Sequence, residues 1–354
     1  KDAAVEADDV DLAALVFAAL AITPTSAQRA PTSELISAEG PFTLCTLEVP
    51  DTDNVYHGVN QLRESAAAKS GGAGATITVT YSGFSGPAQI AFEYAADIWE
   101  AHLESDVTIR VEAIYEPLGT NVLGSAGALR VYADPSFPIP NTFYGDALAD
   151  ALAGRDLSPG NPDIRARFSS NFTGWYFGTD GNTPIGQVDF VSVVLHELGH
   201  GLGFFGSATV QSGVGQYGIA TQGGDLIPVV FDRFVEDSAG NRIVGPTYPN
   251  PSGALGNLLR SQNLFWGGAT AIAVYGGERP PIYAPAAWEQ GSSFSHYDET
   301  VIPTGNVNAL MTPQLARGES FQNPGPLTCA LFQDIGWTLA PGCAALVVDD
   351  EDGP

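Results

Sequence analysis

The first half of the chain carries the hydrophobic patterns of both strands and helices. Three segments alternate apolar and polar positions and are rich in β-branched residues, which predicts strands at 75–84, 107–117 and 163–170. Residues 87–105 begin with a proline and repeat apolar side chains at helical spacing, at Ile90, Tyr94, Ile98 and Trp99. A second, strongly apolar helix is predicted from Val188. This order of elements favours an α+β fold with a twisted sheet backed by helices.

The remaining segments carry weaker patterns. Residues 141–154 are expected to form a surface loop with a short helical turn, and the chain after Gly206 is dominated by Gly, Pro, Asn and Ser. In that half we expect a short helix, a short strand or hairpin, and a closing helix that stops at Gly336, at 252–262, 268–277 and 326–340. The change at Gly206 divides the chain into four parts, with a cleft between the second and third: an N-terminal segment (1–75), a first lobe (76–206), a second lobe (207–340) and an acidic tail (341–354).

Composition changes this picture in two ways. The chain has 40 acidic and 14 basic residues, a net charge of −26, so it repels phosphate backbones and nucleic acid is not an expected partner. Near the start, Leu12–Ile22 is apolar but too short to span a bilayer, and small residues follow it at 25–27. We interpret it as an export signal with an unusually acidic front, the alternative being a short buried or amphipathic helix. Elsewhere the sequence has no apolar stretch long enough for stable membrane insertion, and it carries no signal for an oligomeric state.

The chain has three cysteines and no C-x-x-C pair. Cys329 and Cys343 would close a short loop near the C-terminus, and we predict a disulfide between them. Cys45 is then left over. It is either a buried or free thiol or a latency thiolate that caps a metal.

The stretch "VDFVSVVLHELGHGLGFFG" (188–206) carries the chemistry. On a helix His196 and His200 lie one turn apart on one face, where two imidazoles can bind one zinc ion. Glu197 lies beside them, where it can take a proton from a zinc-activated water and return it to a leaving amine. The alternative is a core helix with two hydrogen-bonded histidines and a surface glutamate.

Catalytic zinc commonly has three protein ligands and one open position. Three further histidines are present, of which His57 and His102 fit solvated or capping roles. By elimination His296, in "GSSFSHYDE", is the predicted third ligand, with Glu236 as the acidic alternative.

"HELGHGLG" resembles the signature of the metzincin zinc peptidases, although Gly206 stands where the third histidine is expected. "SSFSHYDETVIPTGNVNALMTP" is similar to the leishmanolysin-like branch, bacterial secreted type, in which an insertion displaces that ligand. The resemblance implies that His296 is the displaced ligand and that Met311 is the Met-turn residue, a structural floor beneath the metal. It implies a two-lobed fold, with a twisted mixed sheet and two helices above an irregular C-terminal lobe. It also implies a secreted zinc endopeptidase that acts on proteins or peptides held along the sheet's edge strand, and we expect 163–170 to be the strand nearest the motif helix.

Two other functions remain as alternatives. One is a non-catalytic surface or adhesion module with a structural zinc, and the other is a metal-dependent hydrolase of substrates other than peptides. Two smaller sites also have alternatives. Tyr297 either stabilises an oxyanion or packs as an aromatic. Asp180 and Asn182 either hold Ca²⁺ or form an Asx-type turn.

Overall fold

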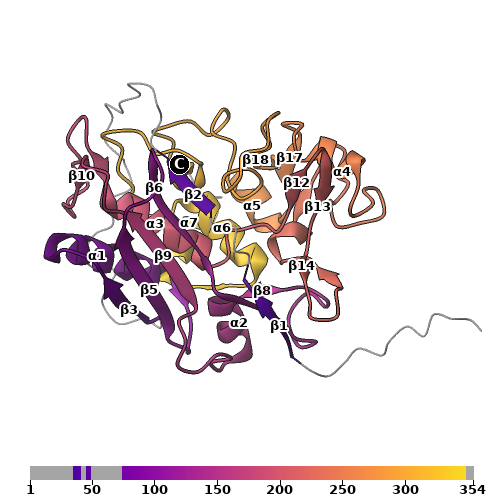
Figure 1. Cartoon of the computed structure of the whole chain (residues 1–354), viewed down its shortest axis with the longest axis horizontal. Coiled ribbons are helices and arrows are strands. Elements are labelled where there is room, and N and C mark those ends of the chain that lie inside the picture. Colours follow the sequence, from indigo (N-terminus) through magenta and orange to yellow (C-terminus); the bar gives the residue numbers. More distant parts are fainter. Residues whose placement is uncertain (1–34, 41–44, 49–73, 348–354) are drawn as a thin grey trace, which may run out of the picture. The chain divides into compact units, whose positions relative to one another are not determined.

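A five-stranded mixed sheet forms the framework of the structure, a computed structural model that describes residues 35–40, 45–48 and 74–347 (Figure 1). The strand order is β2 (Cys45–Glu48), β6 (Val122–Ala128), β9 (Ile164–Ser169), β5 (Ile109–Glu116) and β3 (Ile77–Ser82). Strands β3, β5 and β9 are parallel, whereas β6 is antiparallel to β9 and β2 is antiparallel to β6. The three predicted strands and the α+β fold are confirmed.

Strand β9 was expected nearest the motif helix, where the substrate-binding edge should be, and this prediction is wrong. Strand β9 lies in the middle of the sheet, β6 lies beside it and β2 forms the edge. The reason is the sequence of β6, "VLGSAGA", whose small residues show no alternation and give no strand signal. The strand next to the motif helix at this side of the sheet is therefore β6.

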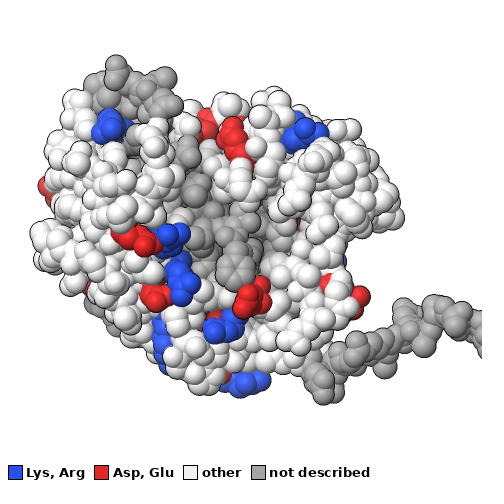
Figure 2. Space-filling view, viewed as in Figure 1, with Lys and Arg blue, Asp and Glu red and all other residues white. Residues whose placement is uncertain are grey.

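Helices α1 (Gly86–His102) and α3 (Phe190–Gly201) pack on one face of the sheet. The rings of Phe92 from α1 and Phe190 from α3 both contact Phe168 of β9. The opposite face carries ion pairs between neighbouring strands, from Arg165 to Glu112 and from Arg167 to Glu116. The alternation in β5 and β9 thus separates a buried face from a charged one, and Figure 2 shows acidic and basic side chains close together on the face in view.

Helix α1 is confirmed, and of the apolar positions that predicted it Ile98 and Trp99 are buried. Ile90 is 66% exposed, and the buried face consists mainly of alanines with Phe92 and Trp99. The small alanines let α1 approach α3, to which the Trp99 indole donates a hydrogen bond at the Leu195 carbonyl (3.0 Å).

Residues 141–154 were expected on the surface, and this too is wrong. Asp146–Ala153 form helix α2, whose first five residues are buried. It follows β8 (Tyr144–Gly145), which with β7 (Arg130–Ala133) and β1 (Ile36–Glu39) makes a three-stranded sheet. The helix is buried through its alanines and leucines. Two aspartates interrupt its apolar pattern, which is why the sequence did not predict a buried helix here.

The remaining elements, from β10 onward, are short. Paired strands are β10 (Trp175–Tyr176) with β11 (Val188–Asp189), β12 (Thr209–Gln211) with β13 (Val214–Gln216), β14 (Ile219–Ala220) with β15 (Leu226–Ile227), and β16 (Val235–Glu236) with β17 (Leu264–Trp266) and β18 (Pro281–Ile282). Short helices are η2 (Phe231–Arg233), α4 (Gly253–Leu258), α5 (Ala269–Val274) and η3 (Ala309–Met311).

Of these, α4 was predicted, whereas α5 replaces the strand or hairpin expected at 268–277. The carboxylate of Asp334 explains the difference, because it accepts hydrogen bonds from the backbone N–H groups of Thr270 and Ala271 (2.9 and 3.1 Å). These groups lie at the start of the helix and lack partners within it. A partner so far along the chain leaves no local signal.

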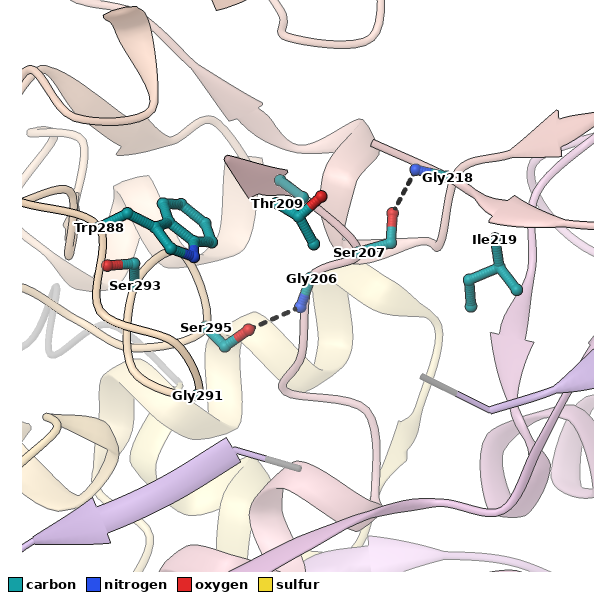
Figure 3. A pocket seen from close by; sticks show the side chains of 10 residues that line it. Gly206, Ser207, Thr209, Gly218, Ile219, Trp288, Gly291, Ser293 and Ser295 are labelled. Carbon is teal, nitrogen blue, oxygen red and sulfur yellow. Dashed lines mark hydrogen bonds between the residues drawn. The ribbon is translucent and has the colours of Figure 1, made fainter. Parts of the chain in front are cut away.

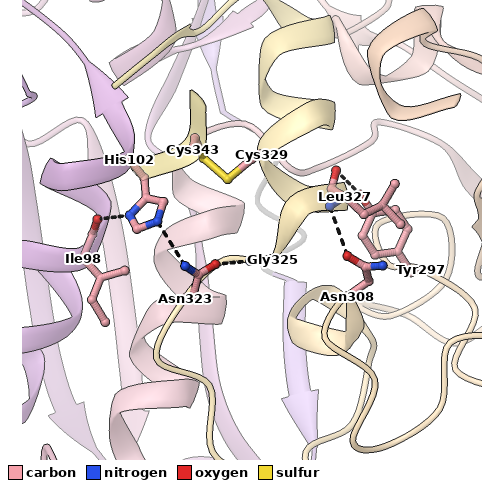
Figure 4. Close-up of a disulfide and its surroundings, with 9 residues drawn as sticks. All are labelled: Ile98, His102, Tyr297, Asn308, Asn323, Gly325, Leu327, Cys329 and Cys343. Carbon is pink, nitrogen blue, oxygen red and sulfur yellow. Dashed lines mark hydrogen bonds between the residues drawn. A yellow bond between two sulfur atoms is a disulfide. The ribbon is translucent and has the colours of Figure 1, made fainter. Parts of the chain in front are cut away.

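The predicted closing helix is α6 (Pro326–Ile335), which stops at Gly336. Helix α7 (Pro341–Val347) follows β19 (Thr338–Leu339), which pairs with β4 (Leu103–Glu104). The predicted disulfide between Cys329 and Cys343 is confirmed and joins α6 to α7 (Figure 4). All described residues fall in one compact unit, and none of their helices is long and apolar enough to cross a membrane.

Candidate metal centre

Helix α3 positions the first two histidines. Its N-terminus is capped by Asp189, which accepts a hydrogen bond from the Ser192 backbone N–H (3.0 Å), and all twelve of its residues are buried. His196 and His200 lie one turn apart, and their Nε2 atoms are 2.9 Å apart. The two rings lie on one face of a buried helix, as their spacing in the sequence predicts.

The third ring comes from the loop between β18 and η3. The His296 carbonyl accepts from the Tyr283 N–H (2.8 Å), and the Tyr297 N–H donates to the Met311 carbonyl (2.9 Å). This backbone pairing brings His296 Nε2 to 3.2 Å from His200 Nε2 and 3.3 Å from His196 Nε2.

Backbone carbonyls fix the tautomer of all three rings. The Nδ1 atoms of His196, His200 and His296 lie 2.6, 2.6 and 2.7 Å from the carbonyl oxygens of Leu310, Phe204 and Ser292, respectively. A carbonyl oxygen only accepts, so each Nδ1 carries the proton and each Nε2 presents a lone pair. Burial lowers the pKa of His196 to about 4 and of His296 to about 3, and it lowers the pKa of His200 well below its ordinary value. All three rings are therefore neutral near pH 7.

Three lone pairs that converge without a proton between them repel one another unless a cation lies among them. Zinc held by three nitrogens at about 2.0–2.1 Å in tetrahedral geometry separates those nitrogens by about 3.3 Å. The observed separations of 2.9, 3.2 and 3.3 Å are close to that value. The three histidines are also the group whose ring nitrogens could together hold a metal ion. The donor set therefore fits zinc.

The fold leaves no room for a side chain at position 206, where the motif would place a third histidine. A Cβ atom on Gly206 would lie 2.2 Å from the Phe294 ring, so no side chain fits there. The Gly206 N–H instead donates to the Ser295 hydroxyl (3.1 Å), which ties the end of the motif to the loop that carries His296.

Strand β6 passes directly against Glu197. This glutamate is fully buried, and a Cβ atom on Gly124 of β6 would lie 2.9 Å from its Cγ and Oε1 atoms. Strand β6 also pairs antiparallel with β2, with Leu47 opposite Gly124. Backbone at the edge of β6 therefore lies close to the Glu197 carboxylate.

Met311 lies under the motif helix. It is fully buried, and a Cβ atom on Gly199, between the two helical histidines, would lie 2.9 Å from its sulfur. Its neighbour Leu310 provides the carbonyl that orients His196. This segment, η3, therefore packs against the motif helix and orients one of its histidines, and the Met-turn role of Met311 stays a prediction.

A pocket of about 170 Å³ opens where the end of the motif meets the loop that carries His296 (Figure 3). It is lined by Gly206, Ser207 and Ser295, which adjoin the motif and His296, and by Trp288 and Ile219 from the second half. The Ser207 hydroxyl accepts from the Gly218 N–H (2.7 Å), which holds the far wall in place. A side chain of moderate size fits this space.

Other candidate residues lie outside the site. Glu236 forms ion pairs with Arg242 and Arg279 (3.2 and 2.9 Å). The residue that lies beside His196 and His200 is therefore His296 and not Glu236. His102 is buried rather than solvated, and its Nδ1 bonds to the Ile98 carbonyl at the end of α1 (Figure 4).

Tyr297 donates its hydroxyl to the Leu327 carbonyl (3.2 Å) and packs on Phe204, which fits the packing alternative. Asp180 accepts from the Asn182 N–H (3.0 Å) in an exposed Asx-type turn, so calcium there stays a prediction. His57 and the candidate export signal lie outside the described residues, and the thiol role of Cys45 also stays a prediction.

Sequence reasoning missed the groups that orient the rings. The carbonyls of Leu310, Phe204 and Ser292 belong to the backbone, and no residue type signals them. Gly124 was missed for the reason given for β6. Compared with known protein families and with curated proteins, the chain matches none.

Proposed function

We propose that the chain is a secreted zinc-dependent endopeptidase with a metzincin-type fold of the leishmanolysin-like branch. The observation that carries this proposal is the convergence of three Nε2 lone pairs within 2.9–3.3 Å, each ring tied through Nδ1 to a carbonyl. In this fold the sheet and motif helix belong to a first lobe (76–206), and His296 and Met311 belong to a second (207–340).

His196, His200 and His296 hold the metal. When bound, zinc supplies a Lewis acid that polarises a carbonyl and lowers the pKa of water toward about 7. Three protein ligands leave a position open for substrate, whereas structural sites are closed by four. Among the described residues the cluster contains three histidines, which favours the catalytic function over the adhesion module.

Glu197 handles the proton. Its carboxylate follows the first ligand on the same helix, at the edge of the site, where it accepts a proton from water. It then delivers that proton to the nitrogen of the leaving amine, so one carboxylate acts first as base and then as acid. Burial of Glu197 excludes bulk water from this transfer.

The substrate lies along the outer edge of β6. That edge already accepts an antiparallel strand, β2, opposite Gly124 and hence beside Glu197. A peptide in the same pairing gains backbone hydrogen bonds and places a peptide bond at the site. One of its side chains enters the pocket beside Gly206. This arrangement favours peptides over other hydrolysable substrates.

Secretion is proposed on two grounds. The disulfide between Cys329 and Cys343 is typical of oxidising compartments. The net charge of −26 fits protein or peptide partners better than nucleic acid.

The test separates the metal from the proton transfer. Full-length protein is assayed for zinc content and for casein hydrolysis, with and without a chelator. We expect one zinc per chain and chelator-sensitive cleavage. Glu197→Gln should keep zinc and lose at least about 100-fold in rate, because a general base contributes about 10²–10⁴-fold. His296→Ala should lose stoichiometric zinc.

Glu112→Gln, on the charged face of the sheet, is the matched control and should behave as the wild type. Zinc-loaded protein that cleaves no casein would support the adhesion module instead. Unchanged zinc in a folded His296→Ala variant would show that the third ligand is another residue.

A further inference from the structure

A second cluster of ligand-type side chains lies apart from the histidines, around helix α2. Asp146 and Asp150 lie one turn apart on α2, and Asp163 directly precedes β9. Each is at most 2% exposed, and one carboxylate oxygen from each lies within 4.8 Å of the others. Three carboxylates buried so close together require a compensating charge.

Two carboxylate oxygens of this cluster have no hydrogen-bond partner. Asp150 Oδ1 accepts from the Leu157 N–H (2.9 Å), and Asp163 Oδ2 accepts from the Arg110 N–H (2.7 Å). The second oxygen of each, Asp150 Oδ2 and Asp163 Oδ1, is buried with no hydrogen-bond partner. Asp146 accepts from the Ser158 hydroxyl (3.2 Å). Buried polar atoms are nearly always satisfied, so two such oxygens in one cluster indicate a missing ligand.

The arginines near the cluster do not satisfy its two unpaired oxygens. Among the described residues, two guanidinium groups lie near it, those of Arg130 and Arg110. The Arg130 Nη1 atom lies 3.8 Å from Asp146 Oδ2 and makes no hydrogen bond. The Arg110 side chain pairs instead with Asp156. Burial, reinforced by the neighbouring carboxylates, raises the pKa of Asp146 to about 8. The folded chain thus disfavours three free charges here.

We propose that Asp146, Asp150 and Asp163 bind a calcium ion. The donors are all oxygens, which suits a hard cation better than zinc, whose sites are built mainly on Cys and His. Calcium accepts carboxylates, carbonyls and hydroxyls in a flexible geometry, whereas magnesium requires a near-ideal octahedron and retains its waters. A dry cluster of three carboxylates, with the Ser158 hydroxyl beside them, favours calcium.

The position of α2 gives the site a structural role. A Cβ atom on Gly145, at the start of α2, would lie 3.2 Å from the Phe205 ring, and one on Gly203 would lie 3.9 Å from Leu148. Helix α2 therefore supports the turn by which the chain leaves the motif helix. A cation that joins α2 to the start of β9 stabilises this support without taking part in the histidine site.

The test is thermal unfolding of the full-length, zinc-loaded protein in calcium-depleted buffer and in millimolar CaCl₂. We expect calcium to raise the Tm by roughly 3 °C or more, because a ligand that binds only the folded state stabilises it. Titration calorimetry should give one calcium per chain. Asp163→Asn and Asp150→Asn preserve side-chain size, and each should lose the shift and the binding heat while keeping zinc.

Asp180→Asn, in the exposed Asx-type turn, is the matched control and should keep the full shift. Wild-type protein that takes up no calcium would overturn the proposal, as would an undiminished shift in both cluster variants. An equal shift with MgCl₂ would overturn the choice of calcium. None of these results depends on peptidase activity, so they stand apart from the proposed function.

Discussion

Gly124 leaves the space that the Glu197 side chain occupies. Because a Cβ atom there would lie 2.9 Å from both Cγ and Oε1, Gly124→Ala should displace the carboxylate while leaving the three rings in place. A displacement of about 1 Å in a catalytic group can cost about 100-fold in rate. We expect kcat/KM to fall roughly 10–100-fold on a peptide substrate, with zinc content unchanged.

The matched control is Gly253→Ala, because a Cβ atom on Gly253 meets nothing within 4 Å. Wild-type activity in a correctly folded Gly124→Ala variant would show that Glu197 is not confined by β6.

At this scale the sequence predicts residue types and misses orientation. His196, Glu197 and His200 follow from spacing on a helix, and the scarcity of histidines singles out His296. The carbonyl partners of the rings and the Phe294 ring against Gly206 depend on distant backbone, which residue patterns do not encode.

Among the elements, β2 occupies the edge of β6 that we assign to the substrate. Its presence there should compete with substrate binding. Neighbouring residues of a strand point their N–H groups to opposite sides, so only one of Thr46 and Leu47 directs its N–H toward β6. Proline lacks this donor. We expect one of Thr46→Pro and Leu47→Pro to raise the rate of peptide hydrolysis several-fold through a lower KM.

The other variant of this pair serves as the control, since its proline replaces an N–H that faces away from β6. Equal KM values for wild type and both variants would show that β2 does not compete with substrate.

Elements with strong local patterns were predicted, and those defined by their partners were not. Helix α1 and strands β3, β5 and β9 have clear periodicity. Strand β6 is built of small residues, α2 is interrupted by aspartates, and α5 depends on Asp334. The strand order, and hence the true edge, depends on β6 and could not be predicted.

For the whole molecule, buried carboxylates should make stability depend on pH. Burial, reinforced by Glu319, raises the pKa of Glu299 from 4.5 to about 7. A raised pKa in the folded state favours the protonated form, so the contribution of Glu299 to stability is fully present below pH 4.5 and is lost as the pH rises through about 7. Glu299→Gln should therefore be more stable than the wild type at pH 8, by roughly 1–3 kcal/mol, and nearly equal to it at pH 4.

Urea unfolding at both pH values measures this difference, and the exposed Asp225→Asn variant is the control. Parallel pH profiles for wild type and Glu299→Gln would contradict the assignment. The excess of acidic residues is evident from composition, but which carboxylates are buried depends on the fold.

The separation of 100 residues between His196 and His296 has a consequence for how the protein forms. Bringing these positions together closes a long loop, and the loss of chain entropy must be offset by other contacts before the third ring can join the first two. The β16–β17–β18 pairing and the backbone hydrogen bond between His296 and Tyr283 supply such contacts. They form when residues 207–295 pack. We therefore expect the three rings to come together late in folding. A metal bound to all three should then stabilise the packed second half of the chain as well as the helix that carries the motif.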